Sequence, residues 1–226
     1  MKVKLISFSQ ANEWFRDVEG VKRPKSLQDL IAYAARVSNP ANQNNEATAE
    51  KLIRYLAKHK HWSPFEMVSA CLEITTTRDI ARQILRHRSF SFQEFSQRYA
   101  DPTEDLEFEL REARLQDDKN RQNSIQTNNE DLKRAWIMKQ EQLIHEAKIA
   151  YKWAIDNGIA KEQARAILPE GNTVSRLYMN GTLRSWIHYI ELRSANGTQK
   201  EHMDIAKECA FALISVFPMI QEYVND

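Results

Sequence analysis

Apolar and polar residues alternate most clearly over residues 68–75, where every second side chain is apolar. A period of two predicts a strand with one buried face, and Cys71 falls on its more polar face. Residues 3–8 are rich in strand-forming side chains and predict a short opening strand. Leu106, Phe108 and Leu110 predict a third strand by the same alternation.

Helical spacing accounts for most of the remaining apolar residues. It predicts helices over residues 26–37, 46–58, 78–88, 132–155, 161–168, 184–193 and 199–217. Ser26 is a candidate N-cap, and Asn157-Gly158 ends the long helix. Residues 114–130 are dense in Asp, Asn, Gln and Arg, which predicts a mobile surface loop.

Length and composition narrow the class of protein. The 226 residues suit one large domain, here residues 1–226. Its 32 basic and 31 acidic side chains give a net charge of +1, which argues against a dedicated nucleic-acid binder. With 5 glycines, a Rossmann or P-loop nucleotide site is not expected.

The two cysteines, Cys71 and Cys209, show no disulfide framework and no metal-ligand spacing, so no metal is predicted. No signal peptide or membrane span is predicted either, and a reducing cytoplasmic location is the expectation.

The densest candidate chemistry lies between Arg86 and Tyr99. These fourteen residues hold three arginines, a histidine, three serines and a glutamate, with Phe90, Phe92 and Phe95 interleaved. Guanidinium groups bind phosphates in two-point fashion, and serine hydroxyls complete such a cradle. The stretch therefore predicts an anion pocket with flat apolar walls, suited to a nucleotide. The alternative is a solvated basic helix end.

The order of these residues resembles a known signature. Arg86-His87-Arg88, then seven residues, then Ser96 and Arg98 resemble the signature of the flavin-dependent thymidylate synthases. Three flanking elements resemble that family in the same order: residues 61–66, 164–169 and 180–193. One departure is that Gly181-Thr182-Leu183 separates Asn180 from Arg184, where many members have Asn-Ala-Arg-Ser.

The resemblance implies a fold, a reaction and partners. The implied fold is α+β, a small mixed sheet with several helices, assembled as a homotetramer whose active sites are shared between subunits. The implied reaction is reductive methylation of dUMP to dTMP. It uses 5,10-methylenetetrahydrofolate as carbon donor and FAD reduced by NADPH as hydride donor. Neither a nucleic acid nor a membrane is an implied partner.

The resemblance also implies site residues. Arg193 takes the catalytic position, where a guanidinium polarises the pyrimidine edge, and His61 lies on the folate side. The implied FAD-binding residues are Ser63, Arg86, His87, Arg88, Glu94, Asn180 and His188. The implied dUMP-binding residues are Gln83, Ile84, Leu85, Arg86, Glu94, Phe95, Ser96, Gln97, Arg98, Arg165 and Arg193.

Several alternatives remain open on sequence alone. A nucleic-acid-binding module would use the same arginines and stack bases on Phe90, Phe92 and Tyr99. A flavoprotein of the same fold with another substrate is a second alternative. Local structural roles also compete with functional ones: a capping box at Ser63-Pro64-Phe65-Glu66, packing for His188, and helix-dipole capping for Arg193. Trp136 and Trp153 suit the core or a subunit interface.

Overall fold

The computed structural model describes residues 2–12 and 26–225. Its centre is a four-stranded sheet in the order β1–β2–β6–β3, with all three neighbouring pairs antiparallel. The predicted mixed sheet is therefore wrong in this respect, although the small α+β architecture is confirmed. The strands are β1 (Lys2–Phe8), β2 (Ser69–Thr77), β6 (Val174–Thr182) and β3 (Ser91–Glu94).

Apart from one short helix at residues 102–105, which was not predicted, the helices lie where the apolar spacing places them. They are α1 (Leu27–Ala35), α2 (Ala49–Lys58), α3 (Arg78–Ile84), α4 (Pro102–Asp105), α5 (Glu130–Asp156), α6 (Lys161–Ala164), α7 (Leu183–Ser194) and α8 (Lys200–Leu213). Short 3-10 segments add Pro40–Asn42, Glu46–Thr48, Ser63–Met67, Arg165–Ile167 and Pro218–Tyr223. Ser26 caps α1 as predicted. Gly158 follows α5 with a φ of 77°, a conformation that glycine adopts without strain.

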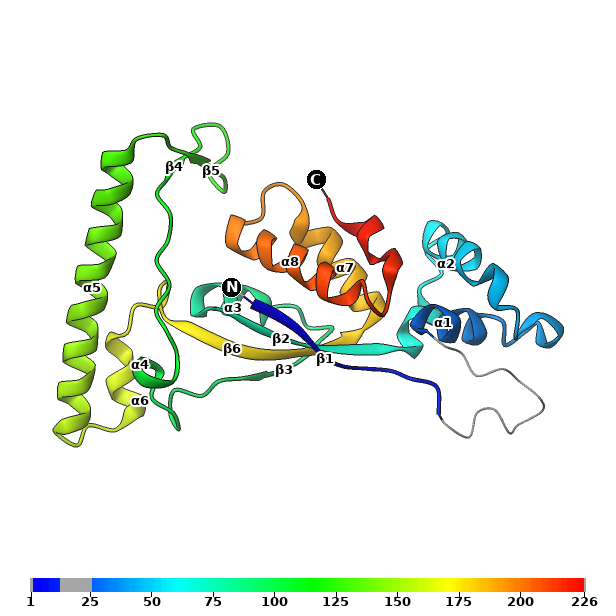
Figure 1. Ribbon diagram of the computed structural model, residues 1–226, viewed down its shortest axis with the longest axis horizontal. Helices are drawn as coiled ribbons and strands as arrows, with labels where there is room; N and C mark the ends of the chain where they lie inside the picture. The colour runs from blue at the N-terminus through cyan, green and yellow to red at the C-terminus, as the bar shows by residue number, and fades with distance from the viewer. Residues whose placement is uncertain (1, 13–25, 226) are drawn as a thin grey trace.

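The core lies between one face of the sheet and three helices. In Figure 1, α3, α7 and α8 lie over the same face of the sheet. The residues that β2 and β6 turn toward them include Leu72, Ile74, Leu177 and Met179, all fully buried. The alternate residues lie on the other face, where the Oη of Tyr178 donates to Glu73 across the β2–β6 pair at 2.9 Å.

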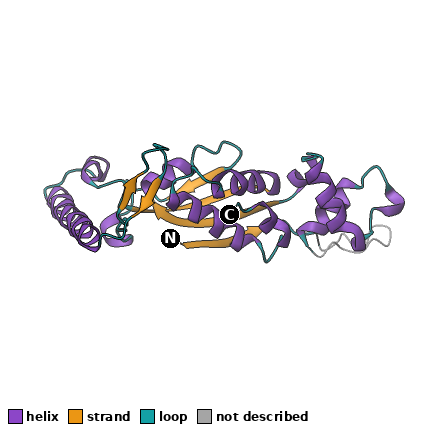
Figure 2. Ribbon diagram, turned by 90° about the horizontal axis from the view of Figure 1, so that it is seen from above, coloured by secondary structure: helices purple, strands orange, loops and turns teal. Residues whose placement is uncertain are grey.

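The molecule is elongated along the sheet. Helix α5 stands at one end, joined to the strands through α6, and the pair α1–α2 stands at the other end (Figures 1 and 2). Only part of α5 is covered within the chain: Ala147, Tyr151 and Ala154 are buried, whereas Trp136 and Trp153 are 43% and 61% exposed. The two tryptophans are thus not core residues of the single chain.

Two predictions between α4 and α5 are wrong. Residues 106–110 form no strand; the segment makes one bridge, Phe108 to Thr173, and is then held by the side chains of Asn172 and Gln140. Residues 114–130 are not a plain loop, because β4 (Arg114–Gln116) and β5 (Ser124–Gln126) pair as a hairpin. Leu115 faces Ile125 across it, a pairing that the polar composition of this segment concealed.

Three local features also differ from expectation. Helix α3 ends at Ile84, so Arg86 and His87 lie in the following turn. Ser63 does not cap a helix; it begins a 3-10 turn, and Glu66 instead pairs with Arg184 at 2.7 Å. Strands β3 and β6 were not predicted, although residues 175–181 do alternate between buried and exposed side chains.

Within residues 2–12 and 26–225, none of the helices combines the length and apolar character needed to span a membrane.

Candidate active site

The first half of the signature meets the end of α7. His87 lies in the turn after α3, and its Nε2 accepts a hydrogen bond from the Nε of Arg193 at 2.9 Å. The His87 ring also packs edge-on against Tyr189, with 4.9 Å between ring centroids. These contacts place the signature histidine beside the proposed catalytic arginine, a pairing that sequence spacing alone did not predict.

His87 is held in its neutral form. Burial is the main cause of its lowered pKa of about 4, and the nearby charges of Arg193 and Arg86 add to the effect. A neutral ring with an unprotonated Nε2 is the form that accepts from Arg193. His87 therefore orients the Arg193 guanidinium without neutralising its charge.

Arg86 and Arg88 offer free positive charge at the same turn. Both side chains are exposed, and neither forms an ion pair with another residue in the described part of the chain. Unpaired guanidinium groups beside a buried aromatic cluster suit a phosphate or diphosphate. The residues present therefore fit the anionic part of a dinucleotide cofactor.

Glu94 belongs to a second group, at the end of β3. Its carboxylate accepts from Ser175 at 2.8 Å and lies 3.7 Å from Arg78 and 3.5 Å from Arg82. Arg82 also pairs with Glu170 at 3.3 Å. Arg78 and Arg82, one turn apart on α3, are thus both balanced by acidic side chains. Burial lowers the pKa of the Arg78 guanidinium against the opposing charge of Glu94, and the neighbouring charges of Arg82 and Arg165 add to the lowering.

The second half of the signature lies near α6. Arg98 pairs with Glu162 at 3.4 Å, and Lys161 donates to the carbonyl of Tyr99 at 3.0 Å. Gln97 is buried, yet its Nε2 finds no hydrogen-bond partner among the described residues. A buried amide nitrogen with no partner costs stability unless a bound group satisfies it.

Strand β3 separates the two halves of the signature. Ser91 pairs with Asn180 near one end of β6, and Glu94 pairs with Leu177 three residues further along. The chain stays extended to Phe95, whose N–H donates to Arg176. An extended strand advances roughly 3.3 Å per residue. Arg98 and His87 therefore do not converge on one pocket within a single chain.

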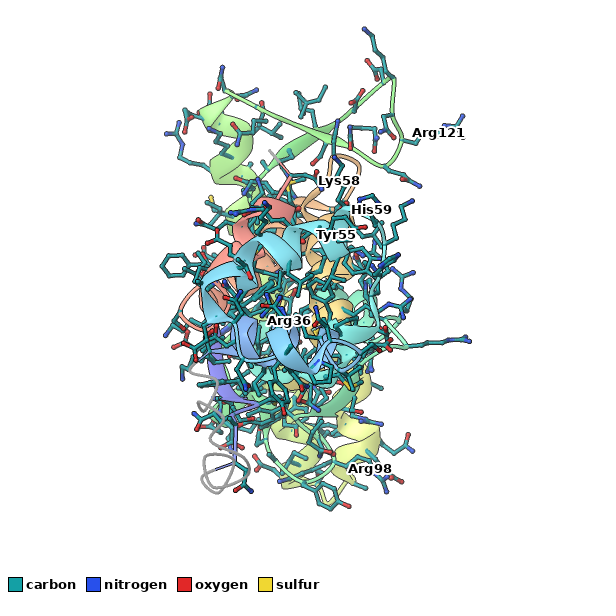
Figure 3. The ribbon with its side chains drawn as sticks, turned by 90° about the vertical axis from the view of Figure 1, so that its right-hand side faces the viewer. Arg36, Tyr55, Lys58, His59, Arg98 and Arg121 are labelled. Atoms are coloured by element: carbon teal, nitrogen blue, oxygen red, sulfur yellow. The ribbon has the colours of Figure 1, made fainter. Side chains whose placement is uncertain are left out.

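A third group surrounds His188. Its ring packs edge-on against Trp62 at 4.7 Å, and burial followed by the charge of Arg184 lowers its pKa. His61 lies close by, in an aromatic cluster with Tyr55 and His59. Figure 3 shows Tyr55, Lys58 and His59 together at the end of α2, well away from Arg98. A hollow here is lined by Arg54, Ala57, Lys58, Lys60, Trp62, His188, Glu191, Glu222 and Tyr223.

Asn180 and Ser63 remain exposed in the single chain. Asn180 lies on β6, between Cys71 of β2 and Ser91 of β3. Gly181 and Thr182 complete β6, and Leu183 begins α7. The side chain of Thr182 caps this helix by accepting from the N–H of Ser185. The departure from the family pattern is thus a strand end that sequence analysis did not recognise.

Some predicted contact residues serve the core. Ile84 is fully buried among apolar side chains, so its side chain is a packing residue. Phe90 is 8% exposed and packs edge-on against Trp186 at 4.8 Å. Base stacking on Phe90, part of the nucleic-acid alternative, is therefore not available.

A polar cluster behind Gln83 was not predicted from the sequence. One chain of hydrogen bonds joins Gln83 to residues of α7 and α8. Its other members are Tyr189 on α7, His202 and Glu201 on α8, and Gln199 just before α8. Residues 199–217 were predicted as a helix, but nothing in their spacing marked His202 or Glu201.

Comparison with known proteins supplies the class of protein. A sequence profile described as "Thymidylate synthase complementing protein" matches residues 21–219. The "Probable flavin-dependent thymidylate synthase" of Paramecium bursaria Chlorella virus 1 is 51% identical over 225 residues, covering 100% of this chain and 99% of its own. The "Flavin-dependent thymidylate synthase" of Synechocystis sp. is 51% identical over 197 residues, covering 87% and 89%. This chain belongs to the thymidylate synthase complementing protein family, the flavin-dependent thymidylate synthases.

A solved structure agrees with this assignment. The UMP/dUMP methylase PolB from Streptomyces cacaoi, crystallised with 5-Br dUMP, superposes with a TM-score of 0.79 at 25% identity. The match covers 98% of this chain and 93% of that one. The elongated arrangement of sheet and helices is therefore shared with a known nucleotide methylase.

Proposed function

We propose that this protein methylates dUMP reductively to dTMP. 5,10-Methylenetetrahydrofolate supplies the carbon and NADPH-reduced FAD supplies the hydride. The observation that carries the proposal is the contact between His87 and Arg193. This contact joins the signature to the end of α7, where the charged guanidinium of Arg193, held in one orientation, can face a pyrimidine. Relatives that are 51% identical and named flavin-dependent thymidylate synthases support the same reaction.

FAD supplies the redox chemistry that no side chain of this chain can perform. Arg86 and Arg88, exposed and unpaired within the described residues, would hold its anionic part. His87, Ser63, Asn180, His188 and Glu94 would complete the flavin site, and His61 would lie on the folate side. We include Glu94 because its carboxylate is already fixed by Ser175 and two arginines.

The chain's own residues have distinct roles toward dUMP. Arg193 would stabilise negative charge that develops on the pyrimidine when its 5-carbon becomes nucleophilic. Arg98 and Arg165 would hold the phosphate, with Ser96 as a neighbouring hydroxyl donor. Gln97 would offer its unsatisfied amide nitrogen. Gln83, Leu85, Arg86, Glu94 and Phe95, and the backbone of Ile84, would line the rest of the nucleotide site.

The protein would act as a homotetramer with shared active sites. Within one chain the two halves of the signature lie at opposite ends of the β3–β6 pair. A second copy that brings its own Arg98 to the Arg86–Arg193 region would complete the site. The exposed Trp136 and Trp153 on α5 give an apolar surface for such assembly.

We place the protein, as a single domain, in the cytoplasm, because Cys71 and Cys209 are both free thiols.

One preparation tests the proposed function. Purified protein should be yellow or take up added FAD, and with dUMP, the folate and NADPH it should form dTMP. Colourless protein that takes up no FAD in equilibrium dialysis would exclude the proposal. Flavin uptake without dTMP formation would favour a flavoprotein of this fold with another substrate.

A further inference from the structure

A buried histidine links Tyr189 to Gln83. His202 lies in the first turn of α8 and is fully buried. Its Nε2 is 3.2 Å from the Oη of Tyr189, and its Nδ1 is 3.2 Å from the Oε1 of Gln83. Both ring nitrogens are therefore engaged, one by α7 and the other by α3.

The chain of contacts continues to a buried carboxylate. The Nε2 of Gln83 donates to the Oε1 of Gln199 at 2.7 Å, and the Nε2 of Gln199 donates to the Oε2 of Glu201 at 3.0 Å. Glu201 is only 5% exposed and pairs with Arg114 at 2.5 Å and Arg111 at 3.4 Å. The two arginines hold the carboxylate in place.

The carboxylate fixes the direction of every bond in this chain. An ionised carboxylate only accepts, so Gln199 must turn its amide nitrogen toward Glu201 and its oxygen toward Gln83. Gln83 then presents its nitrogen to Gln199 and its oxygen to His202. His202 must donate from Nδ1, and its Nε2 must accept from the Tyr189 hydroxyl. One tautomer of His202 satisfies all four bonds.

The charge states of Glu201 and His202 agree with these hydrogen-bond directions. Burial opposes ionisation of Glu201, but hydrogen bonds from its own backbone N–H and from Gln199, with the charges of Arg111 and Arg114, lower its pKa. Burial, followed by the electrostatic effects of Arg193, His87 and Arg86, lowers the pKa of His202 to about 3. His202 is therefore neutral and Glu201 charged at physiological pH.

Gln83 is left with one amide N–H and one carbonyl lone pair outside this chain. Its side chain is only partly buried, so a ligand can reach these groups. An amide free to rotate could exchange its donor and acceptor ends. We propose that His202 and Glu201 are positioning residues that lock the Gln83 amide in one orientation for the nucleotide. This inference rests on the proposed function, because Gln83 acts there in dUMP binding.

Two substitutions of His202 separate positioning from packing. In His202→Asn the new amide nitrogen takes the place of Nδ1, so the donor to Gln83 is kept. In His202→Gln the amide takes the place of Nε2, so the Tyr189 contact is kept and the Gln83 contact is lost. Both variants lose the imidazole ring and each retains one of its two polar contacts. A difference between the two variants therefore reports which contact was lost, not the loss of the ring. FAD-loaded protein would be titrated with dUMP, and flavin absorbance and thermal unfolding recorded on the same samples.

The two variants should differ in dUMP affinity. A hydrogen bond contributes about 1 kcal/mol net, so His202→Gln should weaken dUMP binding about fivefold. His202→Asn should stay within about twofold of wild type, with FAD content unchanged in both. Equal dUMP affinity in both variants, or equal losses that follow thermal stability, would overturn the positioning role.

The tautomer of His202 gives an independent readout. Nitrogen NMR of ring-labelled histidine should show Nδ1 protonated and Nε2 unprotonated, with the signal assigned by its loss in His202→Gln. Glu201→Gln removes the acceptor-only end and should allow a mixture of tautomers. A fixed Nε2–H tautomer in wild type would overturn the inference. Wild type that shows the Nδ1–H tautomer but binds no dUMP would overturn the proposed function, and with it the purpose assigned to Gln83.

Discussion

The Nε–H of Arg193 donates to the Nε2 of His87 over 2.9 Å, and this bond ties the last turn of α7 to the turn after α3. The bond uses the nitrogen that lies within the arginine side chain rather than at its tip. The two terminal nitrogens of the guanidinium therefore stay available for a ligand, and the Nε bond fixes the direction in which they point. Lysine has no nitrogen at the Nε position and cannot form this bond. Helix-dipole capping, the alternative role for Arg193, needs only the positive charge.

Arg193→Lys should abolish most dTMP formation while FAD stays bound. Lysine keeps the charge but loses both the planar fork and the bond to His87. A charge-assisted hydrogen bond contributes about 1.5–3 kcal/mol, so turnover should fall at least about tenfold. The measurement is dTMP formation and flavin content on the same sample. Arg134→Lys, on the exposed surface of α5, is the matched control and should behave as wild type. Normal turnover in Arg193→Lys would leave Arg193 as a helix cap.

Gly181→Ala should destabilise the fold and displace the signature turn. A Cβ at this position would stand 2.4 Å from the Cδ1 of Phe90, whose ring is wedged against Trp186. Overpacking of this kind costs about 1–3 kcal/mol. Because Phe90 directly follows Arg88 and Ser89, FAD affinity should fall as well. Urea unfolding and flavin titration measure the two effects.

Gly171→Ala is the control for that substitution. Nothing lies within 4 Å of a Cβ built at Gly171. Its unfolding free energy should stay within about 0.5 kcal/mol of wild type. If both alanine variants were equally stable, the close packing of Phe90 on Gly181 would not constrain this turn.

Acidification should destabilise the protein before its carboxylates titrate. His87 and His202 have pKa values of about 4 and about 3 in the folded state, against about 6.5 in an unfolded chain. As pH falls below about 6.5, the unfolded chain binds protons that the folded state does not, so the unfolding free energy falls. Urea unfolding at several pH values between about 7.5 and 5 measures this slope.

His202→Asn removes one of the two groups and should flatten the slope between those pH values. The variant and wild type should converge in relative stability as the solution is made more acidic. An unchanged slope in the variant would mean that His202 is not held neutral by its surroundings.

The helices were largely predictable because their apolar residues recur at helical spacing along the chain. Residues 132–155 and 199–217 illustrate this, since α5 and α8 fall within about a turn of the predicted bounds. Strand β6 escaped prediction although its side chains alternate. Its sequence contains Arg176, Asn180 and Gly181, and the buried positions become apparent only beside β2. The hairpin at Arg114 depends on a distant partner, the ion pair with Glu201, which no local pattern reveals.

The candidate site, like the fold, could be predicted from the sequence only in part. The family signature predicted Arg86 and His87 as site residues, and the flanking element 180–193 predicted Arg193. The sequence did not show that Arg193 contacts His87, since the two are brought together by α3 and α7 both packing on α8. The series of hydrogen bonds from Tyr189 to Glu201 could not be predicted from the sequence, because it is built from single polar residues on three separate elements.

Mixed subunits should test whether the active site is shared. Gln83 and Arg86 precede β3, whereas Arg98 follows it and pairs with Glu162 of α6. If one chain supplies Gln83 and another supplies Arg98 to the same nucleotide, then Gln83→Ala and Arg98→Ala proteins should each be inactive alone. Their exchange mixture should regain activity, because some sites combine an intact half from each chain. Native mass spectrometry would confirm that subunits have exchanged. Exchanged but inactive mixtures would mean that both halves of the signature serve the same chain, and that the extended β3 must fold back when the nucleotide binds.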